Sequence, residues 1–338
     1  DKFNLTYPLE YSANYENPIA MLDLMGRSLD EVMLMAGRPT QRVRAEWLVV
    51  DAQIIACGTA MAASYPTYGD YDGSPSIKDK TEDGLWFSPF QSNRTYWHEM
   101  GHLHNLPTLG CQEQESNVHL LKAVIDSNVA KLPIDTALQN SGFQPFTRLD
   151  AAFDLMFTVD WQVEERVCGE NDVLYGGNQM RYQTKSWART IELADLYGWE
   201  AVGKSHNVFY EKNIRNEYIK DYEISDDEFV YRSSFAVGVN LAPIFDFWGI
   251  PVDPNIKNGL GVLPSPVEFL DRLNLYKNAI PKNEGEYQAR LKDLRSGVGQ
   301  DQFVRIDYWI ENYSAGTLEK MHERIDKIAL EIKESLSN

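Results

Sequence analysis

The chain has 338 residues, of which 43% are hydrophobic and 12% aromatic, a composition that places it among globular proteins and excludes a disordered chain. Its 32 Lys and Arg against 50 Asp and Glu give a formal net charge of −18, which argues against nucleic acid or an anionic membrane surface as the main partner. No apolar run approaches the ~20 residues that a membrane span needs.

The N-terminal part of the chain is expected to form one helix and a small sheet. Apolar residues recur at helical spacing in residues 18–36, which predicts an amphipathic helix. In residues 42–55 the apolar side chains first alternate and then become nearly continuous, which favours a strand. Residues 61–68 are a further extended segment, which Pro66 would confine to the edge of the sheet, where an extended peptide could add itself.

Beyond a polar loop at residues 69–82, the chain is predicted to be mostly helical. Further helices are expected over residues 112–130, 146–163, 186–197, 201–218, 267–294 and 317–336, with a short one beside Pro243. Residues 251–266 are rich in Pro, Gly and Asn, which indicates a boundary. We therefore predict a domain of residues 1–255 and a helical C-terminal extension of residues 256–338.

The sequence His98-Glu99-Met100-Gly101-His102 has the spacing of a metal-binding helix. Helical residues four apart project from the same face, so both imidazoles can reach one ion. Zinc suits such a site, because it takes neutral nitrogen ligands in a tetrahedral arrangement with a fourth position open for water. We therefore expect one zinc ion bound by His98 and His102, with Glu99 as the general base that acts on the zinc-bound water.

A zinc site of this kind needs a third protein ligand, which should come from the following helix. Glu113 and Glu115 are the acidic candidates just downstream. Glu113 is preferred, because Asn117 lies four residues later and could orient it as a hydrogen-bonding partner. Glu115 has His119 in the equivalent position and is the alternative.

These residues resemble the active site of the enhancin-like, mucin-degrading zinc metallopeptidases, gluzincin-type enzymes of family M-sixty. That family has H-E-x-G-H and then, after a spacer, a glutamate with Asn four residues later and an apolar residue after it. Glu113, Asn117 and Val118 fit this pattern. Similar segments at residues 42–54, 196–200 and 232–251 extend the resemblance over about residues 18–255.

The resemblance implies a secreted or cell-surface zinc endopeptidase, a hydrolase that cleaves mucin-like O-glycosylated proteins. Trp86 lies where the family places an aromatic residue that stacks on a sugar, with core packing as the competing interpretation. Arg148 and Tyr65 are further candidates for substrate contact, although Arg148 could simply be solvated. Two alternatives stay open: a gluzincin-type peptidase without a glycan requirement, and a non-catalytic family member that binds glycoproteins.

The predicted fold class is α+β. We expect a zincin-like metallopeptidase domain in which a small sheet precedes the zinc helix and a mostly helical subdomain encloses the cleft. The helical C-terminal extension should pack on this domain, because the apolar residues of its last helix recur at three- and four-residue spacing.

Overall fold

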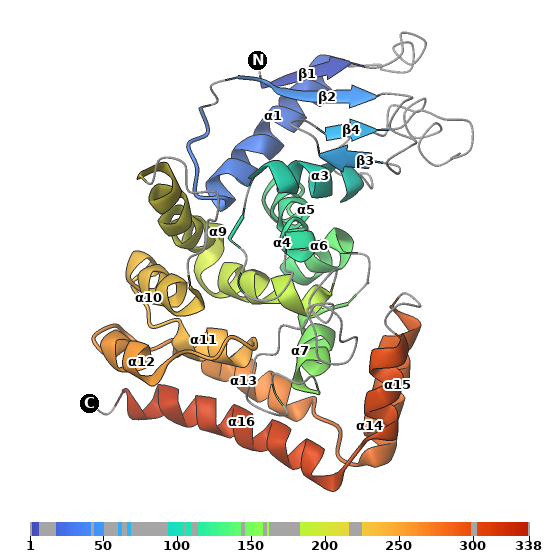
Figure 1. Cartoon of the computed structure of the whole chain (residues 1–338), viewed down its shortest axis with the longest axis vertical. Helices are drawn as coiled ribbons and strands as arrows, with labels where there is room; N and C mark the ends of the chain where they lie inside the picture. The colour runs from blue at the N-terminus through green and yellow to red at the C-terminus, as the bar shows by residue number, and fades with distance from the viewer. Residues whose placement is uncertain are drawn as a thin grey trace.

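The computed structural model describes most of the chain, with gaps between the described segments. The described residues are 2–6, 18–41, 44–50, 60–62, 66–68, 94–104, 106–107, 109, 114–142, 146–157, 161, 183–215, 225–298 and 303–336. Among these residues, no helix combines the length and the apolar character that a membrane crossing requires. The sheet lies at one end of the molecule and the last helix lies across the other (Figure 1).

A four-stranded sheet forms from the N-terminal part of the chain, in the order β1-β2-β4-β3. Its strands are β1 (Phe3–Thr6), β2 (Glu46–Val50), β3 (Ala60–Ala62) and β4 (Pro66–Tyr68). β2 pairs in parallel with β1 and β4, and β3 pairs antiparallel with β4. The strand predicted at residues 42–55 is confirmed over five residues, because its β-branched and aromatic side chains suit a pleated surface.

The predicted place of Pro66 at a sheet edge is wrong. β4 lies between β2 and β3, so β3 is the outer strand on this side of the described sheet. Pro66 is the first residue of its strand, a position at which a missing N–H is tolerated even inside a sheet.

Helix α1 (Pro18–Met35) confirms the predicted N-terminal helix and is continuous through Gly26. Its buried face includes Met25, Leu29 and Val32, which recur at the three- and four-residue spacing of an amphipathic helix. The ammonium group of Lys2 is ion-paired with Asp30, which ties the first strand to this helix.

The described middle part of the chain is helical, and its helix α3 (Arg94–His104) lies between the sheet and the helices α4 (Gln114–Asn117) and α5 (Leu120–Val124) (Figure 1). Its other described elements are the π-helix η4 (Ile125–Val129), α6 (Ile134–Ser141), α7 (Arg148–Met156) and α9 (Thr184–Arg215). The single helix predicted over residues 112–130 is therefore divided into three described pieces. The predicted break between residues 197 and 201 is a kink in α9 at Gly198, whose φ of 81° favours glycine.

The C-terminal part adds a layer of helices to the same core. These helices are α10 (Asp226–Val237), α11 (Ala242–Phe247), α12 (Pro254–Leu260), α13 (Phe269–Asn278), α14 (Glu284–Ser296), α15 (Phe303–Glu311) and α16 (Ala315–Glu334). The apolar stripe of α16 is buried, as predicted, and α16 packs against α11 and α13. The boundary predicted after residue 255 falls inside α12, and one hydrophobic cluster includes residues from both sides of it. The described chain is thus an α+β protein in which helices predominate.

Candidate metal centre

The two histidines of the motif lie on one side of α3, opposite the residues that anchor this helix in the core. Trp97 and Met100 are fully buried. His98 is buried too, whereas the side chain of His102 is 28% exposed. The burial of one face fixes the rotation of α3, and four-residue spacing then places both imidazoles on the other face.

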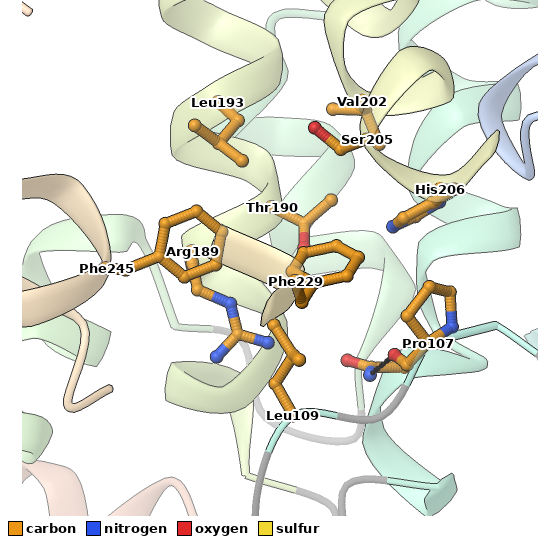
Figure 2. A pocket seen from close by; sticks show the side chains of 11 residues that line it. Pro107, Leu109, Arg189, Thr190, Leu193, Val202, Ser205, His206, Phe229 and Phe245 are labelled. Carbon is orange, nitrogen blue, oxygen red and sulfur yellow. Dashed lines mark hydrogen bonds between the residues drawn. The ribbon is translucent and has the colours of Figure 1, made fainter. Parts of the chain in front are cut away.

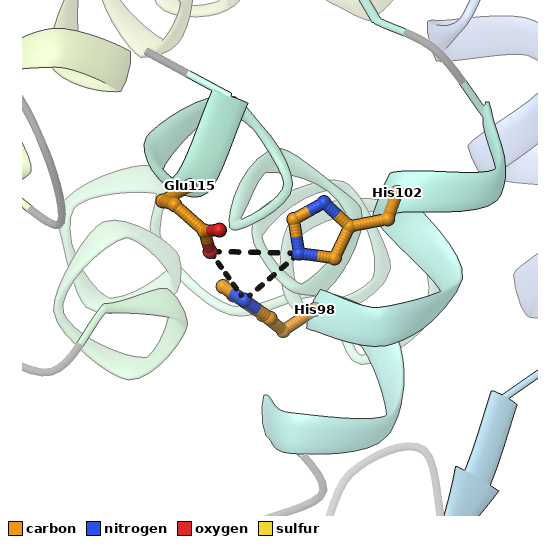
Figure 3. A group of neighbouring side chains, drawn as sticks. All are labelled: His98, His102 and Glu115. Atoms are coloured by element: carbon orange, nitrogen blue, oxygen red, sulfur yellow. Dashed lines mark hydrogen bonds and ion pairs between the residues drawn. The ribbon is translucent and has the colours of Figure 1, made fainter. Parts of the chain in front are cut away.

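Glu115 completes a cluster of three potential ligands. Its side chain comes from α4 and points toward the two imidazoles (Figure 3). The Glu115 Oε2 atom lies 3.2 Å from His98 Nε2 and 3.5 Å from His102 Nε2. The two imidazole Nε2 atoms are 3.2 Å apart. Among the described residues, this is the group whose His, Cys or acidic donor atoms converge closely enough to hold a metal ion.

The structure thus places the alternative ligand, Glu115, in the cluster. Glu113, the preferred ligand, lies outside the described residues, so no distance can be assigned to it. The side-chain Nδ2 of Asn117, the atom expected to orient Glu113, donates one hydrogen bond to the Pro107 carbonyl oxygen at 2.7 Å. This bond ties α4 to the residues after α3, and the preference for Glu113 stays a prediction.

Gly101 allows the residues after α4 to approach α3 closely, and this approach brings Glu115 to the two histidines. A Cβ atom built at Gly101 would lie 2.6 Å from the Cβ atom of Val118 and 2.8 Å from its Cα atom. Real Cβ atoms do not come this close to other heavy atoms. Because Val118 follows α4 directly, the missing side chain at Gly101 allows Glu115 to reach the histidines.

We expect Gly101→Ala to push α3 and α4 apart and to weaken both the fold and metal binding. Overpacking of this kind costs about 1–3 kcal/mol in the free energy of unfolding, and displacement of Glu115 should lower zinc affinity about tenfold. Urea unfolding and zinc titration measure the two effects. Gly26→Ala in α1 is the control, because the nearest atom to its added Cβ is the Lys2 Cδ at 3.7 Å. Equal behaviour of the two variants would contradict the role assigned to Gly101.

The acidic and basic groups of the cluster shift each other's pKa values. The hydrogen bond to Glu115 raises the pKa of His102 above its usual value, with partial burial opposing this shift. Glu99 is half-buried, and its burial raises the pKa of its carboxyl group, which His98 and His102 partly offset. Protons and a metal ion would therefore compete for the same donor atoms, so metal binding should weaken in acid.

Of the three residues predicted to contact a substrate, Arg148 is the one that the structure describes. Trp86 and Tyr65 lie outside the described residues. Arg148 is buried at the start of α7, where its guanidinium group is fully engaged. It forms a bidentate pair with Asp135 at 2.8 and 3.0 Å, and its Nη1 atom lies 2.7 Å from Asp195 and 3.2 Å from Glu192. This geometry supports a structural role for Arg148 and gives no support to a substrate contact.

Contacts of two further residues, His119 and Arg38, help to position the histidine helix, and the sequence did not predict them. The ring of His119 packs against His98, with ring centroids 4.9 Å apart, and against Trp187, with centroids 4.6 Å apart. The guanidinium group of Arg38, just after α1, donates to the carbonyl oxygen of His104 in the last turn of α3. Such contacts between distant segments leave no periodic signal in the sequence.

Comparison with known proteins gives remote relatives. No family model matches the sequence. The chain is 24% identical over 269 residues to a TRPM8 channel-associated factor homolog of Xenopus laevis and 22% identical over 273 residues to that of Danio rerio. It is 23% identical over 270 residues to TRPM8 channel-associated factor 2 of Bos taurus. These matches cover 77–78% of this chain and 26% of each relative, so the chain spans about a quarter of their length.

A solved structure shares the fold. The crystal structure of a functionally unknown conserved protein from Bacillus anthracis str. Ames aligns with a TM-score of 0.52 and 20% sequence identity. The alignment covers 78% of this chain and 51% of that one, and a mutant of the same description gives the same values. At this identity the likeness concerns the fold alone.

The names of the relatives correct the interpretation of the sequence. They are channel-associated factors, and no match supports the predicted membership of the mucin-degrading zinc metallopeptidases. The prediction of a zinc metallopeptidase, and with it that of an O-glycopeptidase that hydrolyses mucin-like proteins, is therefore wrong, and the role of Glu99 as a general base loses its basis. The physical reason is that H-E-x-x-H specifies the spacing of two ligands and a carboxylate, which does not specify a substrate. The secreted or cell-surface location stays a prediction.

Proposed function

We propose that this chain is a zinc-binding module of a regulatory protein that associates with a membrane channel. The observation that carries the zinc part is the convergence of His98, His102 and Glu115 from two helices. The association is suggested by the names of the relatives, which describe factors associated with the TRPM8 channel.

The three donor atoms fit one face of a zinc tetrahedron. Zinc lies about 2.0–2.1 Å from nitrogen and oxygen ligands, so two ligands of a tetrahedral site are about 3.3–3.4 Å apart. The donor atoms of His98, His102 and Glu115 are separated by 3.2, 3.2 and 3.5 Å. Two imidazoles and one carboxylate are also a ligand set that zinc takes when its fourth position is open. An ion could therefore bind with little movement of α3 or α4.

In this proposal the ion joins two helices that are separate in the sequence. His98 and His102 would hold it from α3, and Glu115 would hold it from α4, a helix of only four residues. A ligand that binds only the folded chain stabilises it by mass action, and zinc at 100 times its dissociation constant would add about 2.7 kcal/mol. Zinc content, measured together with the rise in melting temperature, tests this part of the proposal.

A zincin-like arrangement of the domain belongs to the same proposal. Its support is the order of the elements along the chain, which runs from the sheet to the histidine helix and then to the glutamate helix. The contacts of β3 and β4 with α3, which place the sheet beside the histidine helix, agree with it.

For the association we assign the groove between the end of α1, η4, α9 and α10, with an apolar segment of the partner protein as its occupant. The groove has a volume of about 740 Å³, within the usual range of about 300–1,000 Å³ for binding sites. Leu34 lies at the rim of the groove, with 54% of its surface exposed. The side chains of Trp199 and Val208 form apolar parts of the groove wall. The lining carries two acidic residues, Glu31 and Glu200, and two basic residues, Arg38 and Lys204, of which Glu200 and Lys204 are paired at 3.0 Å. The formal charges of the lining therefore sum to zero, and the groove suits an uncharged segment.

Leu34→Asp is expected to weaken the association, because it places a charge at the rim of the groove. We expect the amount of TRPM8 channel that co-purifies with the chain from cells expressing both to fall by about tenfold or more, as for an apolar anchor of an interface. Leu330→Asp on α16 is the matched control, since Leu34 and Leu330 are both 54% exposed. Equal loss in both variants, or in neither, would contradict the assigned surface.

A further inference from the structure

A small cavity lies behind the helix that carries Glu115. It is bounded by Pro107 and Leu109 after α3, by Asn117 of α4, by α9, and by one phenylalanine each from α10 and α11. Figure 2 shows Ser205 and His206 on one side of the cavity and Pro107 and Leu109 on the other. Its volume of about 10 Å³ corresponds to the space that a single water molecule needs, about 10–15 Å³.

Two buried polar atoms in the cavity wall make no hydrogen bond within the described protein. They are the Oδ1 atom of Asn117 and the Oγ atom of Ser205, whose residues are 3% and 2% exposed. A buried polar group left in this state costs about 1–3 kcal/mol. The cavity is therefore large enough for one water molecule, and its wall holds polar atoms that could form hydrogen bonds with that molecule.

His206 offers a third partner on the same wall. Its Nδ1 atom donates to the carbonyl oxygen of Met35 at 2.7 Å. Burial lowers the pKa of this histidine to about 4, so its ring is neutral at pH 7. In this tautomer the Nε2 atom is a hydrogen-bond acceptor.

We propose that this cavity is a binding site for one ordered water molecule that accepts a hydrogen bond from Ser205 and donates to Asn117 Oδ1 and His206 Nε2. Three hydrogen bonds are typical of a buried water, and one donor with two acceptors matches both hydrogens and a lone pair of the molecule.

The water has a consequence for the metal centre, and this step rests on the proposed zinc site. Asn117 and Glu115 belong to the same short helix, and the Nδ2 atom of Asn117 already holds the Pro107 carbonyl oxygen. The water binds the Oδ1 atom of the same amide group and thereby links Asn117 to Ser205 and His206 of α9. Ser205 is thereby a positioning residue, because it holds Glu115 in place through the water and through Asn117.

The first test is a high-resolution crystal structure of the chain. We expect electron density for a water within about 3 Å of both Asn117 Oδ1 and Ser205 Oγ. This measurement does not depend on zinc. A cavity without density would overturn the inference whether or not the metal centre binds an ion, and a chain that binds no zinc but holds the water would contradict only the proposed function.

The second test compares two buried serines in zinc titrations. Ser205→Ala removes the donor to the water and should weaken zinc binding by about 3- to 10-fold, less than the loss of a direct partner of a ligand. Ser233→Ala in α10 is the matched control, because the Ser233 hydroxyl is also buried and makes no hydrogen bond to the residues that the structure describes, but lies outside the cavity. We expect unchanged zinc affinity in the control. An equal effect of the two substitutions would overturn the positioning role of Ser205.

Discussion

Replacing His102 by alanine is expected to abolish tight zinc binding, with a loss of affinity of at least about 100-fold. The reason is that the substitution leaves two protein ligands, His98 and Glu115, where a site with an open position needs three. Isothermal titration with zinc measures the affinity. In the absence of zinc the variant should fold as the parent does, because the side chain of His102 is 28% exposed and contributes little to the core.

Glu115→Ala and Glu113→Ala form a matched pair that decides the third ligand. We expect Glu115→Ala to lower zinc affinity as strongly as His102→Ala, because its carboxylate lies 3.2 Å from His98 Nε2 and 3.5 Å from His102 Nε2. Glu113→Ala should bind zinc as the parent does. The reverse result would restore the ligand preferred from the sequence, and zinc binding unaffected by any of the three substitutions would place the ion elsewhere.

Arg148→Met is expected to lower the free energy of unfolding by about 3–5 kcal/mol, which is the usual cost of leaving a buried charge without its partner. Its guanidinium group links Asp135 of α6 to Glu192 and Asp195 of α9, and Glu192 is fully buried. Arg272 would still contact the two acids of α9, so the variant should fold but unfold at lower urea concentration.

Arg232→Met is the control for this prediction. Arg232 pairs with Glu228 on the surface of α10, four residues away, and its side chain is 49% exposed. Such a pair contributes about 0.3–0.5 kcal/mol, so the control should unfold close to the parent. If the free energy of unfolding of Arg148→Met also stayed within about 1 kcal/mol of the parent value, the network would contribute no more than a surface ion pair does. That result would favour a binding role for Arg148.

The helices and strands with strong periodicity could be predicted from the sequence. The stripe of α16 and the buried face of α1 are examples, because each repeats its apolar residues over several turns. The apolar pattern of residues 112–130 predicts one uninterrupted helix, because the close contact of Val118 with Gly101 of α3, at the turn between α4 and α5, leaves no signal in that pattern. The short α15 was also missed, since nine residues give few repeats of a helical pattern.

The sequence by itself determined the pair His98 and His102, because their spacing depends only on the geometry of one helix. The tertiary structure decided the third member of the cluster. Glu115 reaches the histidines because Gly101 lets Val118 approach α3 and because Asn117 is bound to Pro107. These contacts join separate segments of the chain, and their geometry depends on how the helices pack. The spacing of a local motif therefore defines a place where a metal ion can bind, whereas the partner that such a site serves depends on surfaces that the motif does not encode.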